Sequence, residues 1–169
     1  MSHNTILTSR TLSEQATRPI SISRSQRLAL LEIKHGFGQL APSAADLLQT
    51  AANIADTTGF PAGAPADERL TRLFLRRAAS QLLAPLQQTA SKAEREHDRI
   101  LWQEPSQEQH DARAIAERRL YDARNRVYVA REQADQLIED TLDTLLPLLF
   151  GVTLADLPAL LRLTAEDAA

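Results

Sequence analysis

The histidines and the carboxylates near them are the first residues to consider for catalytic or metal chemistry. Glu94 and His97 have the spacing that places a carboxylate and an imidazole on one face of a helix, as in di-iron bundles. Such centres need this pair twice, and His110 has Gln107, not a carboxylate, three residues before it. Charged neighbours around Glu94 and His97 indicate a solvated face. We therefore predict no metal site and no cofactor.

Nucleophilic catalysis has no convincing candidate. The chain contains no Cys, which excludes thiolate chemistry and sulfur-liganded zinc or iron sites. No G-x-S-x-G, P-loop, G-x-G-x-x-G or H-E-x-x-H motif occurs. The four histidines fall in four separate segments, and a catalytic group needs mutually oriented partners. We expect a protein that is not an enzyme.

Charge is unevenly distributed along a chain whose net charge is −3. Residues 69–131 carry thirteen basic and eight acidic side chains, whereas residues 132–169 carry one basic and eight acidic ones. One interpretation is an ordinary solvated helix surface, with helix-supporting pairs such as Asp122 and Arg126 at i and i+4. The other is a basic patch for an acidic partner or a phosphate, formed by Arg69, Arg72, Arg76 and Arg77.

The C-terminal stretch 142–163 is apolar on more than one face, which a lone amphipathic helix does not need. It predicts either a lid on the core or an interface with another chain, with Leu148, Leu149 and Phe150 as candidate contacts. Its longest apolar run is interrupted and falls well short of the roughly 20 residues of a membrane span. We expect no membrane contact.

The elements that would position these residues are helical, because Leu and Ala dominate the apolar residues and Gly is scarce. We predict an all-α helical bundle built on a long antiparallel hairpin, with residues 26–163 as one domain. Residues 1–25 are a Ser/Thr-rich flexible segment with a possible short strand over 18–24, and residues 164–169 should fray. The predicted helices are 26–35, 44–56, 66–104 with a kink or short break at Pro85, 107–146, and a short one after Gly151.

A heptad seam supports the hairpin of 66–104 against 107–146. Its seven members alternate spacings of four and three over three repeats, as in a coiled coil. Four of them are Ala, which allows a partner helix to approach closely. The members are Ala116, Leu120, Ala123, Val127, Ala130, Ala134 and Leu137.

The N-terminal quarter of the chain also permits a DNA-binding interpretation. Strand, helix, glycine turn and helix follow one another over residues 17–56, an order that resembles the ribbon-helix-helix fold of dimeric repressors and relaxosome accessory proteins. The resemblance rests on Ile20, Ile22, Gly36, Gly38 and Ser43. It implies that two chains pair their strands into a ribbon in the major groove, although Pro19 departs from the long polar side chains of such ribbons. The residues it would place at DNA are Ser21, Ser23, Arg24 and Arg27.

The seam, the missing catalytic groups and the excess of apolar surface favour a non-enzymatic helical protein–protein interaction module: an adaptor, chaperone or inhibitor. The alternative is the dimeric DNA-binding protein. We expect another protein as partner and a homo-oligomer, with nucleic acid as a further possibility. No apolar core of signal-peptide length occurs near the N-terminus, so the expected location is cytoplasmic, although a Ser/Thr-rich signal for specialised export stays open. Arg outnumbers Lys by 17 to 2, a bias typical of GC-rich bacterial or phage genomes.

Overall fold

The computed structural model of the chain describes residues 37–102 and 107–169. Helices account for 78 % of these residues, and no strand occurs among them, which confirms the helical-bundle prediction. The predicted helix 26–35, the possible strand 18–24 and the Ser/Thr-rich segment lie outside the described residues. The elements are α2 (Ala44–Thr57), α3 (Glu68–Leu101), α4 (Gln107–Leu145), the 3-10 turn η1 (Leu146–Leu148) and α5 (Leu157–Asp167).

Side-chain caps fix where the first two of these helices begin. The Ser43 hydroxyl accepts a hydrogen bond from the Asp46 amide at 3.1 Å and donates to the Asp46 carboxylate at 2.7 Å. Asp67 caps α3 by accepting from the Leu70 amide at 2.7 Å. Such caps satisfy amides that have no partner inside the helix. The Ser43 cap agrees with the sequence prediction, and α3 begins at Glu68, two residues later than the expected start at residue 66.

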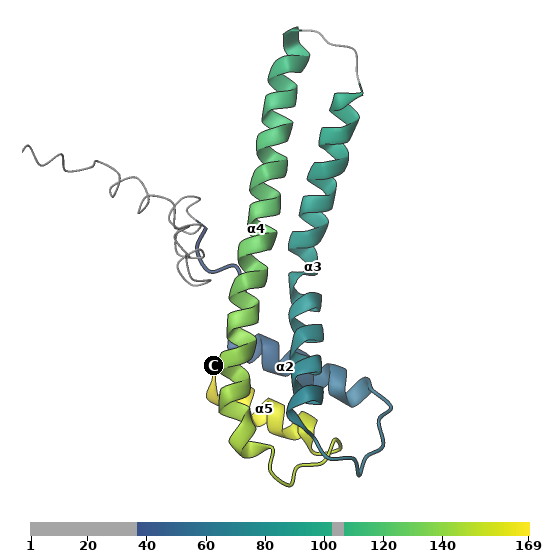
Figure 1. Cartoon of the computed structure of the whole chain (residues 1–169), viewed down its shortest axis with the longest axis vertical. Coiled ribbons are helices and arrows are strands. Elements are labelled where there is room, and N and C mark those ends of the chain that lie inside the picture. The colour runs from purple at the N-terminus through teal and green to yellow at the C-terminus, as the bar shows by residue number, and fades with distance from the viewer. Residues whose placement is uncertain (1–36, 103–106) are drawn as a thin grey trace, which may run out of the picture.

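The two long helices lie side by side (Figure 1). Arg72 pairs with Glu139 and Glu94 pairs with Arg124, so residue numbers rise along α3 while they fall along α4. α3 stays helical through Pro85, so of the kink or short break expected there, the break is wrong. The Thr89 hydroxyl donates to the carbonyl of Pro85 at 2.9 Å within the same turn.

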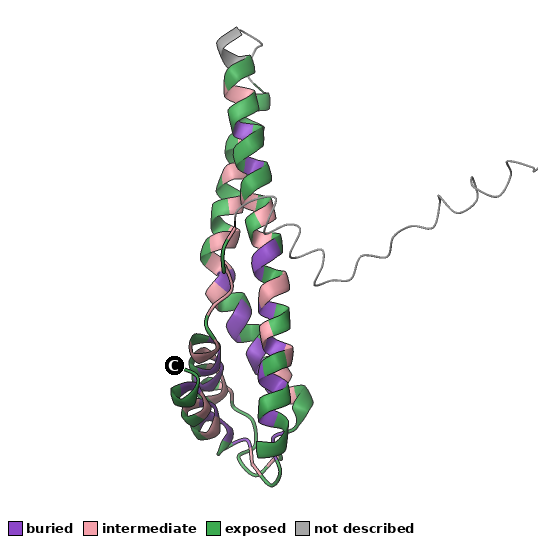
Figure 2. Ribbon diagram, turned by 90° about the vertical axis from the view of Figure 1, so that its left-hand side faces the viewer, coloured by how far each residue is buried: buried purple, intermediate pink, exposed green. Residues whose placement is uncertain are grey.

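The core is concentrated at one end of the hairpin, where α2 and α5 pack beside the long helices (Figures 1 and 2). α2 buries Leu47, Leu48, Ala51 and Ala52 there. Phe74 of α3 is buried among them and meets Phe60 edge-to-face, with ring centroids 6.0 Å apart. We call this end the base.

The seam of α4 departs from a strict heptad. Ala116, Leu120, Ala130 and Ala134 are buried, but Ala123, Val127 and Leu137 are only partly so. Beyond Ala134, burial passes to Ile138, Leu142 and Leu145. A helix with 3.6 residues per turn drifts away from a 3.5-residue repeat, so the buried stripe moves around α4 toward the base.

The segment between α4 and α5 ties the base together. The Ala66 amide donates to Val152 O at 2.9 Å, and the Leu154 amide donates to Ala64 O at 2.8 Å. Gly151 has φ 78°, a conformation that favours glycine. α5 buries Ala165 and continues to Asp167, so the helix includes most of the tail that we expected to fray. Among the described residues, no helix has the length and apolarity required to span a bilayer.

Candidate functional site

The hairpin continues beyond the base as a two-helix projection, which we call the arm: residues 86–101 of α3 and 110–128 of α4 (Figure 1). Within these ranges only Ala116 and Leu120 are buried. The arm also exposes large apolar side chains, above all Trp102 beside its tip, which is 89 % exposed. A projection with so little core of its own presents surface that the fold of the base does not use.

A groove runs between the two helices of the arm and encloses about 460 Å³. Its walls combine small side chains with charged ones, and none of the described residues that line it is aromatic. The small residues are Thr89, Ala93, Ala116 and Ala123, and the charged ones are Lys92, Glu96, Arg119, Asp122 and Arg126. The small residues leave the groove open, and its edges carry both positive and negative side chains.

Glu96 is held in place by its own helix. Arg99 donates to its two carboxylate oxygens at 2.8 and 3.1 Å. These hydrogen bonds, followed by the charges of Arg99 and Arg119, lower the pKa of Glu96 below its ordinary value. The carboxylate is therefore ionised and oriented at neutral pH.

Other charges around the groove are not held by ion pairs, although the charge of Arg119 acts on Glu96. Lys92, Arg119 and Asp122 form no ion pair with any residue of the two described ranges. The expected pair between Asp122 and Arg126 is wrong: the Arg126 guanidinium lies over the ring of Phe37, 5.2 Å from its centroid. Such a contact is a cation–π interaction. The free charges are available to a ligand in the groove.

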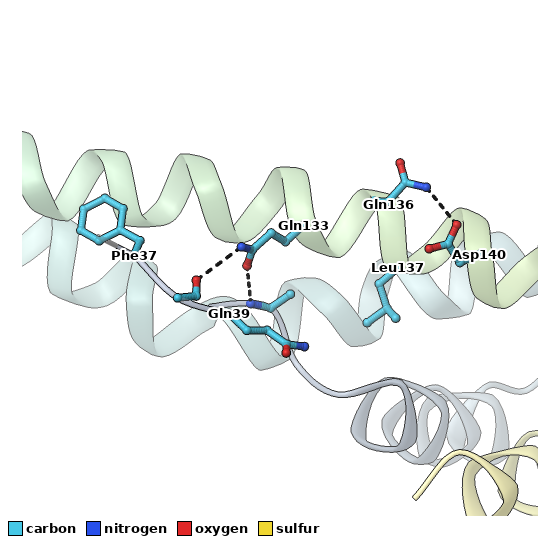
Figure 3. Close-up of a pocket in the computed structure, with 8 residues that line it drawn as sticks. Phe37, Gln39, Gln133, Gln136, Leu137 and Asp140 are labelled. Atoms are coloured by element: carbon cyan, nitrogen blue, oxygen red, sulfur yellow. Dashed lines mark hydrogen bonds between the residues drawn. The ribbon is translucent and has the colours of Figure 1, made fainter. Parts of the chain in front are cut away.

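The residues before α2 form a strap, residues 37–41, which lies along α4 (Figure 3). The Gln133 side-chain oxygen accepts hydrogen bonds from the amides of Leu40 and Ala41 at 2.8 and 3.1 Å, and its nitrogen donates to Gly38 O at 3.4 Å. A pocket of about 530 Å³ lies between the strap and α4, with Leu137 and Asp140 among its walls. One glutamine therefore fixes the path of the chain beside α4.

Three of the four arginines predicted as a basic patch, Arg69, Arg72 and Arg76, line one pocket. Arg72 pairs with Glu68 of its own helix and with Glu139 of α4, and the hydrogen bond that it donates to Glu68 is the main reason that its pKa is raised. Arg69 and Arg76 line a pocket of about 560 Å³ together with Arg72. Arg77 is exposed but is not among the residues lining this pocket.

The three apolar candidates, Leu148, Leu149 and Phe150, differ in how far their side chains are exposed. Phe150 is 97 % exposed and Leu148 is 47 % exposed, as an interface would require. Leu149 is 7 % exposed and belongs to the core, so it is unavailable as a contact. The 3-10 turn η1 and the residues after it turn successive side chains to different sides, which separates them.

The remaining candidates give no second site. Ser21, Ser23, Arg24 and Arg27 lie outside the described residues. Glu94 pairs with Arg124 and not with His97. No group of three potential metal ligands occurs within residues 37–102 and 107–169.

The groove and the strap were not predicted from the sequence. Each arm residue is ordinary by itself, and only the packing of α3 on α4 brings Lys92 and Glu96 to the same groove as Arg119 and Asp122. The Ala content of the seam could have indicated the groove, because Ala leaves space between the helices wherever the facing residues of α3 are also small. No protein-family model, no curated protein and no solved structure matches this chain.

Proposed function

We propose that this protein is a non-enzymatic helical interaction module whose arm groove receives an amphipathic helix of another protein. The observation that carries the proposal is the groove itself, an open channel with small residues and unpaired charges of both signs between two helices that have little core. Partner helices commonly dock by laying an apolar face into a hydrophobic groove, and here Ala93, Ala116 and Ala123 form the apolar part of the lining.

The charges indicate what kind of helix would fit. Lys92, Arg119 and Asp122 form no ion pair with described residues, so a ligand carrying both signs would complement them at the edges of the groove. Bulky residues such as Leu would occupy the space above Ala93 and Ala123. The expected partner segment is therefore a helix with one Leu-rich stripe flanked by acidic and basic residues.

Selection of displayed helical peptides against the full chain tests this proposal. We expect the selected peptides to carry a Leu-rich stripe. Their affinity should fall at least about tenfold, or about 1.4 kcal/mol of binding free energy, when the ring of Ala123→Phe fills the groove. The matched control is Glu117→Phe, an exposed position on the same helix that does not line the groove.

Two results would contradict the proposal: selected peptides that ignore Ala123→Phe, or peptides that respond equally to both substitutions. In the first case the binding surface lies elsewhere, for example at the exposed Leu148 and Phe150. In the second case any phenyl ring added to the arm lowers peptide affinity, and the groove is not the specific binding site.

DNA binding stays the alternative prediction. The apolar side of α2 is already buried against α3 and α5 of the same chain, which leaves little of it for a second chain. A duplex DNA shift at low salt that disappears as salt rises, and that weakens with Arg24→Ala and Arg27→Ala, would favour this alternative.

A further inference from the structure

The end of the base that faces away from the arm carries an exposed aromatic ring. Phe150 comes directly before Gly151 in the turn that joins α4 to α5. Its side chain is almost wholly exposed, so its own chain gives the ring very little contact. Leu146 and Leu148, a few residues before it, are exposed as well. Apolar side chains that gather on a surface in this way are typical of an interaction site.

A pocket that fits such a ring lies at the same end of the molecule. It encloses about 560 Å³ beside the first turns of α3, and Leu70 and Leu73 form its apolar walls. The amide of Ala66, just before α3, donates to the carbonyl of Val152, two residues after Phe150. The ring and the pocket therefore share one end of the base, yet the exposed ring leaves the pocket of its own chain unfilled.

The free charges of this pocket are positive. Asp67 of its lining is engaged as the cap of α3, and Arg72 is paired with Glu139. Arg69 and Arg76 are exposed, and neither forms an ion pair with any residue that the structure describes. Two free cations beside apolar walls suit an acidic segment that carries an apolar side chain.

The last turns of α4, which lead to Phe150, have the opposite charge. Asp140 and Asp143 are exposed there and form no ion pair within residues 37–102 and 107–169. The single basic side chain of residues 132–169 is Arg162, and it is paired with Asp56. One end of the chain therefore holds two complementary halves: an exposed ring beside free carboxylates, and an apolar pocket beside free arginines.

We propose that two copies of this chain pair through this end of the base as a two-fold dimer, in which Phe150 of each copy enters the pocket of the other. The free carboxylates of one copy then face Arg69 and Arg76 of the other. A two-fold axis forms each contact twice and closes the assembly at two chains.

A second copy is favoured over a different protein because the chain itself supplies both the ring and the carboxylates that this pocket suits. The interface lies at the opposite end of the hairpin from the arm groove (Figure 1). It is therefore independent of the function proposed for the groove.

Sedimentation equilibrium of the full chain tests the role of the ring. We expect twice the mass of one chain at micromolar concentrations, and a dimer at least about tenfold weaker for Phe150→Ser, because aromatic anchors in pockets dominate interface energies. The matched control is Ile115→Ser, an exposed apolar position of the arm that lines neither the pocket nor the groove. A natural chain that sediments as a monomer would overturn the proposal, and so would equal weakening by the two substitutions.

Reversing the charges of one half at a time tests how the two copies face each other. One variant carries Arg69→Glu with Arg76→Glu, and the other carries Asp140→Arg with Asp143→Arg. All four positions are exposed, so the fold should stay intact. Each variant alone should dimerise at least about tenfold more weakly than the natural chain, because like charges then meet in both contacts.

An equal mixture of the two variants should recover a dimer, because both contacts of the mixed pair again join opposite charges. Variants that stay monomeric when mixed contradict the proposal, as do variants that dimerise equally well alone and together. Masses above that of two chains would replace the two-fold dimer by a head-to-tail assembly.

Discussion

The base and the arm are made from the same two helices but differ in what surrounds them. In the base, α2 and α5 complete a core in which Phe74, Leu157 and Leu161 are almost wholly buried. In the arm, α3 and α4 have only each other, and a groove stays open between them. The difference separates two roles: burial in the base stabilises the fold, and the arm leaves exposed the groove that we propose as a binding surface.

The largest expected effect is in the base. Phe74→Ala should lower the free energy of unfolding by about 3–5 kcal/mol, because it removes a buried ring and leaves a cavity beside Phe60. Urea unfolding followed by circular dichroism measures this. Leu73→Ala, at the neighbouring exposed position, should cost less than about 1 kcal/mol. A similar cost at both positions would mean that the base has no specific core.

The second prediction compares two alanines of the same seam. Ala130→Leu should cost about 1–3 kcal/mol, because Ala130 is fully buried and the larger side chain overpacks the contact with α3. Ala123→Leu should stay within about 0.5 kcal/mol, because that residue lines the open groove. Arg124→Ala, a surface control, should be equally mild. An unchanged midpoint for Ala130→Leu would refute the division between base and arm.

The third prediction concerns the strap where base and arm meet. Gln133→Ala should cost about 1 kcal/mol, because two backbone amides lose their acceptor. Amide hydrogen exchange should accelerate at Leu40 and Ala41 while the core amides of α2 stay protected. Gln136→Ala, which removes only an exposed contact with Asp140, is the control. Unchanged exchange at Leu40 and Ala41 would mean that Gln133 does not hold the strap.

The smallest effect is electrostatic and lies in the arm. The lowered pKa of Glu96 means that its ion pair with Arg99 favours the folded chain above the ordinary value of 4.5, and that this contribution is lost as pH falls through the lowered pKa. Carboxyl NMR titration should show Glu96 below 4.5, and Arg99→Gln should raise its pKa toward that value. A Glu96 pKa that does not respond to Arg99→Gln would mean that the pair is not formed in solution.

Helical class and several helix limits follow from local sequence. Ser43 begins a helix as its type and spacing predict, whereas Asp67, expected inside the helix 66–104, is the N-cap of α3. Leu and Ala at helical spacing are sufficient to indicate long amphipathic helices. The expectation of a short break at Pro85 was wrong, because α3 continues through it. A proline removes one backbone hydrogen bond, and the packing of a long helix can offset that loss.

What the sequence determined by itself is therefore the local part: the helical class of the described residues, the Ser43 cap, and the absence of the motifs that known catalytic and metal sites require. Tertiary structure alone decided which partner each charged or apolar candidate residue contacts. Arg72 became part of an ion-pair network, Leu149 became core, and Arg126 turned from Asp122 to Phe37. The physical reason is that each of these outcomes depends on a side chain from a segment far along the chain, and helical spacing contains no information about that neighbour.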